Sequence, residues 1–429
     1  MFDKRTIAAG LRTEAAKREF HLLYGGTERT AAEQADRYEA LLSTYAEHFG
    51  CEGEAPAFFS SPGRTEIVGN HTDHNNGLVL AAAVTLDTLA AAAPTGDGII
   101  TLYSQGYDKP FVVDTRDLEK KEAEKNTTDA LIRGVCRKLH DMGYAIGGFN
   151  AAVTSRVLSG SGLSSSAAFE VLLVCILDGL YNGSILDGVT RAKISQWVEN
   201  NYFGKPSGLM DQSACSIGGL VGIDFKYADP KIGAYSFDFA ARGFSLVVLA
   251  TNSSHDDLTD EYAAIPREMR AVAEALGGKV LRDVKVEQLL ERLPEVRQKT
   301  SDRAVLRALH YYDENERVRA MYTALENGDL DAFLDNVIRS GESSWKLLQN
   351  LYVGGSTEQS LALACALSER MLRGSGAWRV HGGGFAGTIL AFVPHYKLAA
   401  YVEKMNAVFG AGACTVLDIR PVGAKKVEL

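Results

Sequence analysis

Four short segments hold most of the side chains that could do chemistry in this chain. The first, residues 62–77, reads PGRTEIVGNHTDHNNG and lies between two apolar stretches. Its polar side chains include Arg64, Glu66, Asn70, His71, Asp73, His74, Asn75 and Asn76. So many polar groups are unfavourable to bury unless a ligand binds them. Their mixture of donors and acceptors suits a molecule rich in hydroxyl groups, although a polar surface loop would have a similar composition.

A metal site in this first segment is not favoured. His71 and His74 lie three residues apart, which invites comparison with metal-binding motifs. The HExxH zinc spacing is absent, however, and the sequence offers no evident third ligand.

The second segment, residues 158–168 (LSGSGLSSSAA), has the composition of a phosphate-binding loop. Gly160 and Gly162 let the backbone approach an anion closely, and serine hydroxyls follow at the start of an expected helix. A helix N-terminus presents unpaired N–H groups and a partial positive charge, so phosphate is its natural ligand. The segment matches neither GxxxxGK[ST] nor GxGxxG, because Ser165 stands at the third glycine position. A serine-capped helix after a glycine turn would have the same composition.

The other two segments supply carboxylates and a glycine run. Residues 199–212 (ENNYFGKPSGLMDQ) place Glu199 and Asp211 on either side of a turn that contains Gly and Pro. One carboxylate could bind a metal–nucleotide and the other could accept a hydroxyl proton, although Asp211 could instead cap a helix. Residues 381–387 (HGGGFAG) contain three successive glycines, which indicate either a close backbone approach or a tight hairpin turn.

The pattern of apolar residues predicts a mixed α+β fold around these segments. Residues 1–50 are expected to be helical, with an apolar stripe along 31–49. Strands are predicted at residues 64–69, 78–86, 98–104, 110–114, 149–157, 244–251, 377–381, 387–393 and 413–419. Helices are predicted at residues 127–142, 163–181, 188–202, 258–276, 285–292, 301–325, 330–351 and 357–373. Because the elements do not alternate strictly as βαβ, the order favours α+β over a doubly wound sheet.

Length, charge and cysteine content limit the class of protein. A chain of 429 residues is expected to form two domains, here 1–235 (with a helical extension at 1–50) and 236–429. The formal net charge of −9 argues against nucleic acid as the main partner. The six cysteines form no CxxC pair, which favours reduced thiols in the cytoplasm. The longest apolar stretch, residues 78–93, is shorter than the ~18–20 residues of a spanning helix, so no membrane segment is expected.

In this order, the motifs resemble those of the galactokinase branch of the GHMP small-molecule kinases, over roughly residues 57–425. The first motif stands here as Pro62-Gly63-Arg64, then Gly69-Asn70-His71-Thr72-Asp73, then Gly77. The others are similar to Gly160-Ser161-Gly162-Leu163-Ser164-Ser165-Ser166-Ala167, to Gly208-Leu209-Met210-Asp211-Gln212, to His255-Asp256-Asp257-Leu258 with Tyr262, and to the run from His381 to Gly387. Each motif is modest evidence alone, but their order over this length is specific.

The resemblance implies a role for each motif. Asp211 would take or orient the proton of a sugar hydroxyl, and Arg64 would hold Asp211 ionised and stabilise the transferring phosphoryl group. Ser166 and Glu199 would bind Mg²⁺. The ATP phosphates would lie on Gly160, Ser161, Gly162, Leu163, Ser164, Ser165 and Ser166, and the sugar on Asn70, His71, Asp73, Gly208 and Tyr262. The implied fold has two lobes with the active site between them. The implied reaction is ATP-dependent phosphorylation of galactose at its anomeric hydroxyl, in a monomer.

Two departures from the family pattern keep other sugars open. The family usually has Glu where Asn70 stands and Tyr where His74 stands. An amide at residue 70 replaces a charged acceptor by a mixed donor and acceptor, so N-acetylgalactosamine, arabinose and galacturonate remain alternative substrates. A catalytically silent galactose sensor is disfavoured, because such paralogues lack part of the serine–alanine loop that is intact at 164–168. A mevalonate or homoserine kinase is disfavoured by the run at 71–73 and by Tyr262, and the N-terminal helical extension is longer than bacterial members are expected to have.

Overall fold

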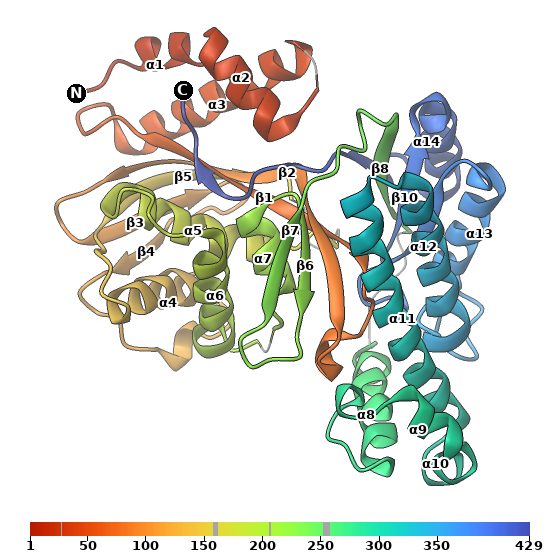
Figure 1. Cartoon of the computed structure of the whole chain (residues 1–429). Coiled ribbons are helices and arrows are strands. Elements are labelled where there is room, and N and C mark those ends of the chain that lie inside the picture. The colour runs from red at the N-terminus through yellow and green to blue at the C-terminus, as the bar shows by residue number, and fades with distance from the viewer. Residues whose placement is uncertain (27, 158–161, 206, 252–257) are drawn as a thin grey trace.

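Two β-sheets organise the structure (Figure 1), a computed structural model that describes all residues except 27, 158–161, 206 and 252–257. Over the described residues the first sheet has eight strands, in the order β12-β1-β2-β5-β3-β4, with β6 and β7 continuing from β2. Their bounds are β1 (Ala57–Val68), β2 (Leu78–Pro94), β3 (Ile99–Ser104), β4 (Phe111–Asp114), β5 (Phe149–Ser155), β6 (Leu220–Asp224), β7 (Lys231–Tyr235) and β12 (Lys425–Lys426). The second sheet has the order β11-β8-β10-β9, with β8 (Phe244–Ala250), β9 (Ala377–His381), β10 (Thr388–Pro394) and β11 (Cys414–Leu417).

The long antiparallel pair β1 and β2 carries the first polar segment at its end. The register between the two strands shifts twice, between Pro62 and Arg64 and between Glu66 and Val68. Such irregularities bend a strand and redirect its side chains, and they are common beside active sites. β1 is buried along almost its whole length, because helices cover both faces of the sheet.

Helices pack on both faces of the first sheet. On one face lie α1 (Lys4–Gly10), α2 (Glu14–Tyr24) and α3 (Glu28–Phe49), whose apolar side chains form a cluster with those of the strands. Tyr38 of α3 contacts Phe58 of β1 with ring centroids 5.0 Å apart. On the other face lie α5 (Ser165–Tyr181) and α7 (Met210–Ile217), and α4 (Thr128–Asp141) and α6 (Gly188–Val198) pack on α5.

A buried carboxylate, Asp87 of β2, joins the N-terminal helices to β1 and to Arg420. Asp87 accepts hydrogen bonds from Arg37 Nη1 at 2.6 Å, from Tyr24 Oη at 2.7 Å and from Ser60 Oγ. Arg420, which is also fully buried, lies 3.7 Å from the same carboxylate and donates to Ser60 Oγ at 2.7 Å. A buried charge needs such partners, so the helices over 4–49 are integral to this part of the fold.

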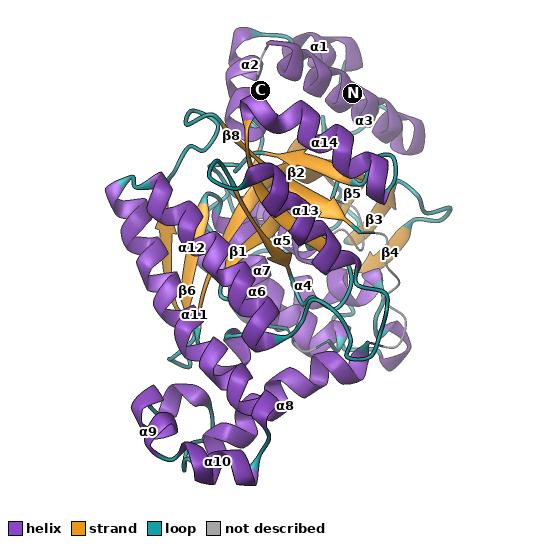
Figure 2. Ribbon diagram, turned by 90° about the vertical axis from the view of Figure 1, so that its right-hand side faces the viewer, coloured by secondary structure: helices purple, strands orange, loops and turns teal. Residues whose placement is uncertain are grey.

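The second sheet is covered by the helices of the second half of the chain (Figure 2). α13 (Ser360–Leu372) and α14 (His395–Phe409) form one apolar cluster with this sheet. α12 (Leu330–Ser343) packs on its other face, and α11 (Asp302–Asn327) contacts both α12 and β2, within a core that is continuous with the first sheet. α8 (Thr259–Ala275), α9 (Val286–Glu291) and α10 (Leu293–Lys299) form a further cluster with the first turns of α11, at the bottom of Figure 1.

Most of the elements predicted from the sequence are present. The helices over 1–50 and the predicted strands and helices beyond them are mostly found within a few residues of their expected bounds, although β1 begins at Ala57 instead of residue 64 and β2 continues to Pro94. The prediction had no separate α10 and omitted α14, β6, β7 and β12, and the helix expected over 330–351 ends at Ser343 and continues as a π-helical turn to Leu348. The domain boundary at 235/236 remains a proposal; β7 ends at Tyr235 in the first sheet, and β8 begins the second. None of the described helices is both long enough and apolar enough to span a bilayer.

Candidate active site

The two residues predicted to be catalytic, Arg64 and Asp211, are hydrogen-bonded to each other. Arg64 lies on β1 and Asp211 in the first turn of α7. Arg64 Nε donates to Asp211 Oδ1 at 2.7 Å, and Nη2 donates to Oδ2 at 2.8 Å. Burial alone would raise the pKa of Asp211, but the charge and hydrogen bonds of Arg64 hold it below its ordinary value. Asp211 does not cap the helix, because Leu209 is the N-cap residue and makes no side-chain cap.

The described part of the phosphate segment lies directly beside this pair. Ser164 Oγ donates to Asp211 Oδ2 at 2.6 Å, and Arg64 Nη1 donates to the carbonyl of Gly162. Ser164 precedes α5 with a φ of +58° and makes no side-chain cap to the helix, so its hydroxyl serves Asp211 instead. Ser165 and Ser166 form the first turn of α5, whereas Gly160 and Ser161 lie outside the described residues.

Gly162 is required by close packing as well as by its backbone conformation. Its φ is +74°, and a Cβ there would lie 2.9 Å from both His381 Nδ1 and Thr388 Oγ1. His381 is buried and accepts hydrogen bonds at Nε2 from Thr65 Oγ1 at 3.0 Å and from the backbone of Glu66. The segment that contains Gly162 and the segment that begins at His381 therefore pack against each other, beside the Arg64–Asp211 pair.

A cavity of about 350 Å³ opens beside Arg64. Its lining includes Arg64, Glu66, Gly69, Asn70, His71, Asp73, His74, Val79, Met210, Tyr262, Pro266, Gly382 and Gly383. Burial raises the pKa of Asp73, and the nearby His71 partly offsets this effect. Gly208 closes over Asp73, since a Cβ at Gly208 would lie 3.3 Å from Asp73 Oδ2. The predicted sugar residues therefore gather around one polar cavity of the size of a small ligand.

The glycine run 382–384 holds three of these side chains through its carbonyl groups. These successive carbonyls accept hydrogen bonds from Asn70 Nδ2 at 2.6 Å, from His71 Nε2 at 2.9 Å and from Tyr262 Oη at 2.8 Å. The run connects β9 to β10, so the hairpin interpretation is correct, and the same hairpin also forms a wall of the cavity. His255, Asp256 and Asp257 of the neighbouring motif lie outside the described residues.

Helix α11 positions the backbone of the first polar segment, which the sequence did not predict. His310 Nε2 donates to the carbonyl of Asn70 at 2.9 Å. Glu314 Oε1 accepts from the backbone N–H of Gly69 at 3.0 Å, and its Oε2 accepts from Arg317 Nε at 2.7 Å. Burial would raise the pKa of Glu314, but Arg317 and the other partners lower it to about 2.

Two further residues of α11 hold the other end of the same segment. Tyr311 Oη donates to the carbonyl of Asn75 at 2.9 Å, and Asn315 Oδ1 accepts from the backbone N–H of Leu78 at 2.7 Å. The signal in the sequence is a set of polar residues at steps of three and four along a helix, Arg307, His310, Tyr311, Glu314 and Asn315, all of them buried.

Comparison with known proteins shows the family to which this chain belongs. The galactokinase galactose-binding signature matches residues 43–94, and the GHMP kinases N terminal domain matches residues 130–219. The galactokinase of Streptomyces coelicolor is 32% identical over 380 residues, which cover 87% of this chain and 94% of that protein. The galactokinase of Bos taurus is 33% identical over 411 residues, which cover 92% of this chain and 98% of that protein. The chain belongs to the galactokinase family.

Solved structures agree with this membership at the level of the fold. The structure of Lactococcus lactis galactokinase complexed with galactose superposes with a TM-score of 0.76 at 24% identity, covering 91% of this chain and 100% of that one. Methanococcus jannaschii mevalonate kinase superposes with a TM-score of 0.61 at 14% identity, covering 88% and 100%. The galactokinase-family chain described here thus has the mixed α+β fold of the GHMP kinases.

In this galactokinase-family site the acidic residues suit a divalent cation. Glu199 Oε2 accepts a hydrogen bond from Gln212 Nε2 at 2.7 Å, and Lys205 Nζ lies 3.2 Å from Oε1. Glu170, one turn after Ser166 on α5, is fully buried, and its Oε1 has no hydrogen-bond partner. Burial, and then the charge of Glu199, raises the pKa of Glu170. The unsatisfied carboxylate oxygen fits a cation that prefers oxygen ligands.

This donor set is too small to enclose a metal by itself. Over the described residues, no group of three or more His, Cys, Asp or Glu side chains could hold one. Mg²⁺ is commonly bound by one or two protein ligands together with phosphate oxygens and water, so the predicted pair Ser166 and Glu199 would need a nucleotide to complete a metal site. Lys205 is 59% exposed, which leaves its side chain room to move away from Glu199. Sequence reasoning missed Glu170, whose signal is its position four residues after Ser166.

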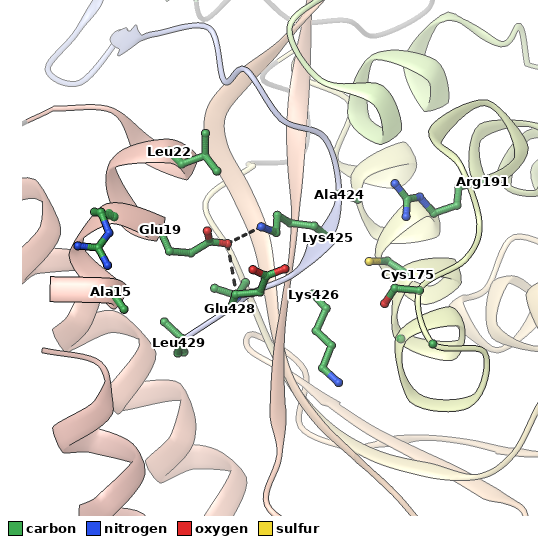
Figure 3. Close-up of a pocket in the computed structure, with 15 residues that line it drawn as sticks. Ala15, Glu19, Leu22, Cys175, Arg191, Ala424, Lys425, Lys426, Glu428 and Leu429 are labelled. Carbon is green, nitrogen blue, oxygen red and sulfur yellow. Dashed lines mark hydrogen bonds and ion pairs between the residues drawn. The ribbon is translucent and has the colours of Figure 1, made fainter. Parts of the chain in front are cut away.

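A larger cavity lies elsewhere and is not the galactokinase site (Figure 3). It measures about 1050 Å³ and is bounded by α2, the start of α6 and residues 424–429, and it includes none of the predicted site residues. Lys425 Nζ pairs with Glu19 at 2.7 Å across this seam, as the dashed line in Figure 3 shows. The cavity follows the boundary between the N-terminal helices and the first sheet.

Proposed function

We propose that this galactokinase-family enzyme transfers the γ-phosphoryl group of ATP to the anomeric hydroxyl of galactose, giving α-D-galactose 1-phosphate and ADP. One observation carries the proposal. The Arg64–Asp211 pair lies between a polar cavity of sugar size and the serines that begin α5. A sugar in the cavity would have a hydroxyl at Asp211, and a phosphate at the N-terminus of α5 would face the same carboxylate.

In the proposed reaction Asp211 accepts the hydrogen bond of the attacking hydroxyl. The hydroxyl oxygen forms the new bond to phosphorus, the bond between the γ-phosphorus and the β–γ bridging oxygen breaks, and the proton passes to Asp211. Because Arg64 keeps the pKa of Asp211 low, Asp211 is a weak base that takes the proton late, as bonding to phosphorus makes the hydroxyl more acidic. This suits a loose phosphoryl-transfer transition state, which asks for orientation and charge neutralisation more than for proton abstraction.

The remaining residues position the reactants. Arg64, which also donates to the carbonyl of Gly162, would stabilise charge on the transferring phosphoryl group. Residues 160–166 would hold the ATP phosphates, and His71, Asp73, Gly208 and Tyr262 would surround the sugar. Ser166 and Glu199 would hold Mg²⁺, which when bound neutralises charge on the phosphate oxygens. We further propose a cytoplasmic location, which the six free thiols support, and a monomeric state, which size-exclusion chromatography with light scattering tests.

A measurement of ADP release over a panel of sugars tests the function. The purified chain would be assayed with ATP and Mg²⁺ against galactose, N-acetylgalactosamine, arabinose, galacturonate and glucose. Galactose should give the highest kcat/KM. A higher value for another sugar would reassign the substrate and leave the mechanism intact. Phosphorylation of another sugar is the second candidate function because Asn70 stands where the family usually has Glu. Saturable sugar binding without turnover of any sugar would contradict the proposed enzyme and favour a sensor.

A further inference from the structure

The side chain of Asn70 has no hydrogen-bonding capacity left for a sugar. Its Nδ2 donates to Glu66 Oε1 at 3.0 Å and to the carbonyl of Gly382 at 2.6 Å. Its Oδ1 accepts from Asn350 Nδ2 at 2.8 Å and from Ser344 Oγ at 3.4 Å. A side-chain amide has two donor hydrogens and two acceptor lone pairs, so all four positions are taken. The residue is also only 1% exposed.

Glu66, in contrast, presents one unbonded carboxylate oxygen at the same cavity. Its Oε1 accepts from Asn70 and from Arg379 Nη2, at 3.0 and 2.9 Å. Its Oε2 has no hydrogen-bond partner among the described residues, and it is not one of the fully buried polar atoms that lack a partner. Glu66 lines the cavity, so this oxygen is available to a ligand.

Glu66 lies at a position on β1 from which it would face the far side of a bound sugar. Arg64 and Glu66 are alternate residues of one strand, in unbroken register with β2, so their side chains lie on the same face. Alternate residues of a strand are about 7 Å apart, roughly the width of a hexose ring. With the anomeric hydroxyl at Asp211, Glu66 would face a hydroxyl on the opposite side of the ring.

We propose that Glu66, and not Asn70, is the residue of this site that accepts a hydrogen bond from a sugar hydroxyl remote from the reacting one. Asn70 and the fully buried Arg379 act as positioning residues, because both bind the other oxygen of the same carboxylate. A carboxylate accepts but cannot donate, so it selects a hydroxyl donor and repels a second carboxylate. The site would thus favour a neutral hexose over a uronic acid that placed its carboxylate there. This inference rests on the proposed function.

A cycle between enzyme variants and deoxy sugars tests the assignment. Wild type and Glu66→Gln would be assayed with galactose and with its 2-, 3-, 4- and 6-deoxy analogues. For galactose, Glu66→Gln should lower kcat/KM about 10- to 100-fold, mainly through KM, because a hydrogen bond to a charged group is lost. One deoxy analogue should be poor for wild type and nearly as good as galactose for the variant, since the two deletions remove the same contact. The KM for ATP should not change.

Two companion variants keep the test decisive. Glu268→Gln likewise removes a carboxylate from a buried arginine, Arg307, but outside the cavity, so it should alter stability and leave the pattern of deoxy sugars as in wild type. If Glu66→Gln does not fold, as circular dichroism would show, the double variant Glu66→Asn with Asn70→Glu is assayed instead. It keeps a carboxylate in the cluster but moves it from β1 to the turn that follows the strand. Its deoxy-sugar pattern should differ from that of wild type.

The outcomes separate this inference from the function on which it rests. If wild type phosphorylates none of the sugars, the proposed function fails. If wild type phosphorylates galactose but no deoxy analogue couples to Glu66, the inference alone is overturned. Coupling of a deoxy analogue to Asn70→Ala, with none to Glu66→Gln, would also overturn it and return the contact to residue 70.

Discussion

Arg64 and Asp211, 147 positions apart in the sequence, meet in a two-point hydrogen bond at 2.7 and 2.8 Å. The pair joins β1 to α7, and Ser164 at the start of α5 adds a third hydrogen bond to the same carboxylate. Planar arginine–carboxylate pairs of this kind fix orientation as well as charge. Three segments that are separate in the sequence are therefore held together at the carboxylate of Asp211.

Removing the charge of Asp211 should suppress turnover. We expect Asp211→Asn to lower kcat by about 100- to 10,000-fold, because the variant can neither take the proton nor pair with Arg64, whereas the KM for ATP should change little. Steady-state ADP release measures both quantities. Asp224→Asn, which breaks a carboxylate pair with Arg282 outside the cavity, is the matched control and should retain activity. Near-normal turnover in Asp211→Asn would refute the role of this residue.

Gly162 should tolerate no side chain because a Cβ would meet His381 and Thr388. Gly162→Ala is expected to raise the KM for ATP strongly and to lower the melting temperature. Gly374→Ala is the control, since Gly374 has a nearly identical φ of +73° but open space around its Cβ position. It should show only the backbone strain of about 1–2 kcal/mol and an unchanged KM. Equal effects of the two substitutions on the KM for ATP would contradict a packing role for Gly162.

Glu314 should contribute both to sugar binding and to stability above its unfolded pKa. Its folded-state pKa is lowered to about 2 from an ordinary value of 4.5, so the contribution is present above the higher value. It is lost as the pH falls from about 4.5 towards 2. Glu314→Gln should therefore cost about 3–5 kcal/mol at pH 7, because it leaves Arg317 unpaired, and less at acid pH.

The two effects of Glu314 are separated by two measurements. Urea unfolding at several pH values follows the stability, and the KM for galactose, which should rise, follows the loop that Glu314 holds at Gly69. Glu316→Gln, at a 76% exposed side chain two residues away, should change neither. A stability difference that is independent of pH would argue against the ionised Glu314.

Glu170 should have the opposite dependence on pH. Burial, and then the charge of Glu199, raises its folded-state pKa, so any stability that it contributes is present at low pH and is lost as the pH rises. Glu170→Gln cannot ionise and should therefore become more stable relative to wild type as the pH rises above 4.5, the ordinary pKa of a glutamate. Thermal unfolding in the presence of a chelator measures this difference. A relative stability that fell with pH would show that wild-type Glu170 is ionised and favourably paired.

Asp87 should be essential for the attachment of the N-terminal helices. Burial would raise its pKa, but Arg37 and Arg420 hold it below the ordinary value. Asp87→Asn should cost about 3–5 kcal/mol at pH 7, since two cations lose their buried partner. Limited proteolysis should then cleave first within residues 1–50. Asp36→Asn, at a 72% exposed residue of the same helix pair, is expected to behave as wild type.

The sequence predicted the local parts of this site and missed the long-range ones. Segments 62–77 and 158–168 could be singled out because their glycines, serines and polar side chains are adjacent in the chain. His310 and Glu314 were missed because polar residues at steps of three and four along a helix more often face solvent. Only folding places these two against the backbone of 69–70. β12 was missed because a strand of two residues is too short to show an alternating pattern of apolar side chains. The role of Asn70 could not be judged either, since its bonding depends on the partners Asn350 and Gly382.

The cluster around Asp87 also sets an order on synthesis. Arg37, Ser60 and Asp87 leave the ribosome long before Arg420 and the edge strand β12 at 425–426. Until Arg420 and β12 have emerged, Asp87 lacks one of its two cationic partners and β1 has an unpaired edge. The edge of β1 thus stays open until β12 has emerged, and a ribosome arrested before that point would present a partly folded intermediate to chaperones and proteases.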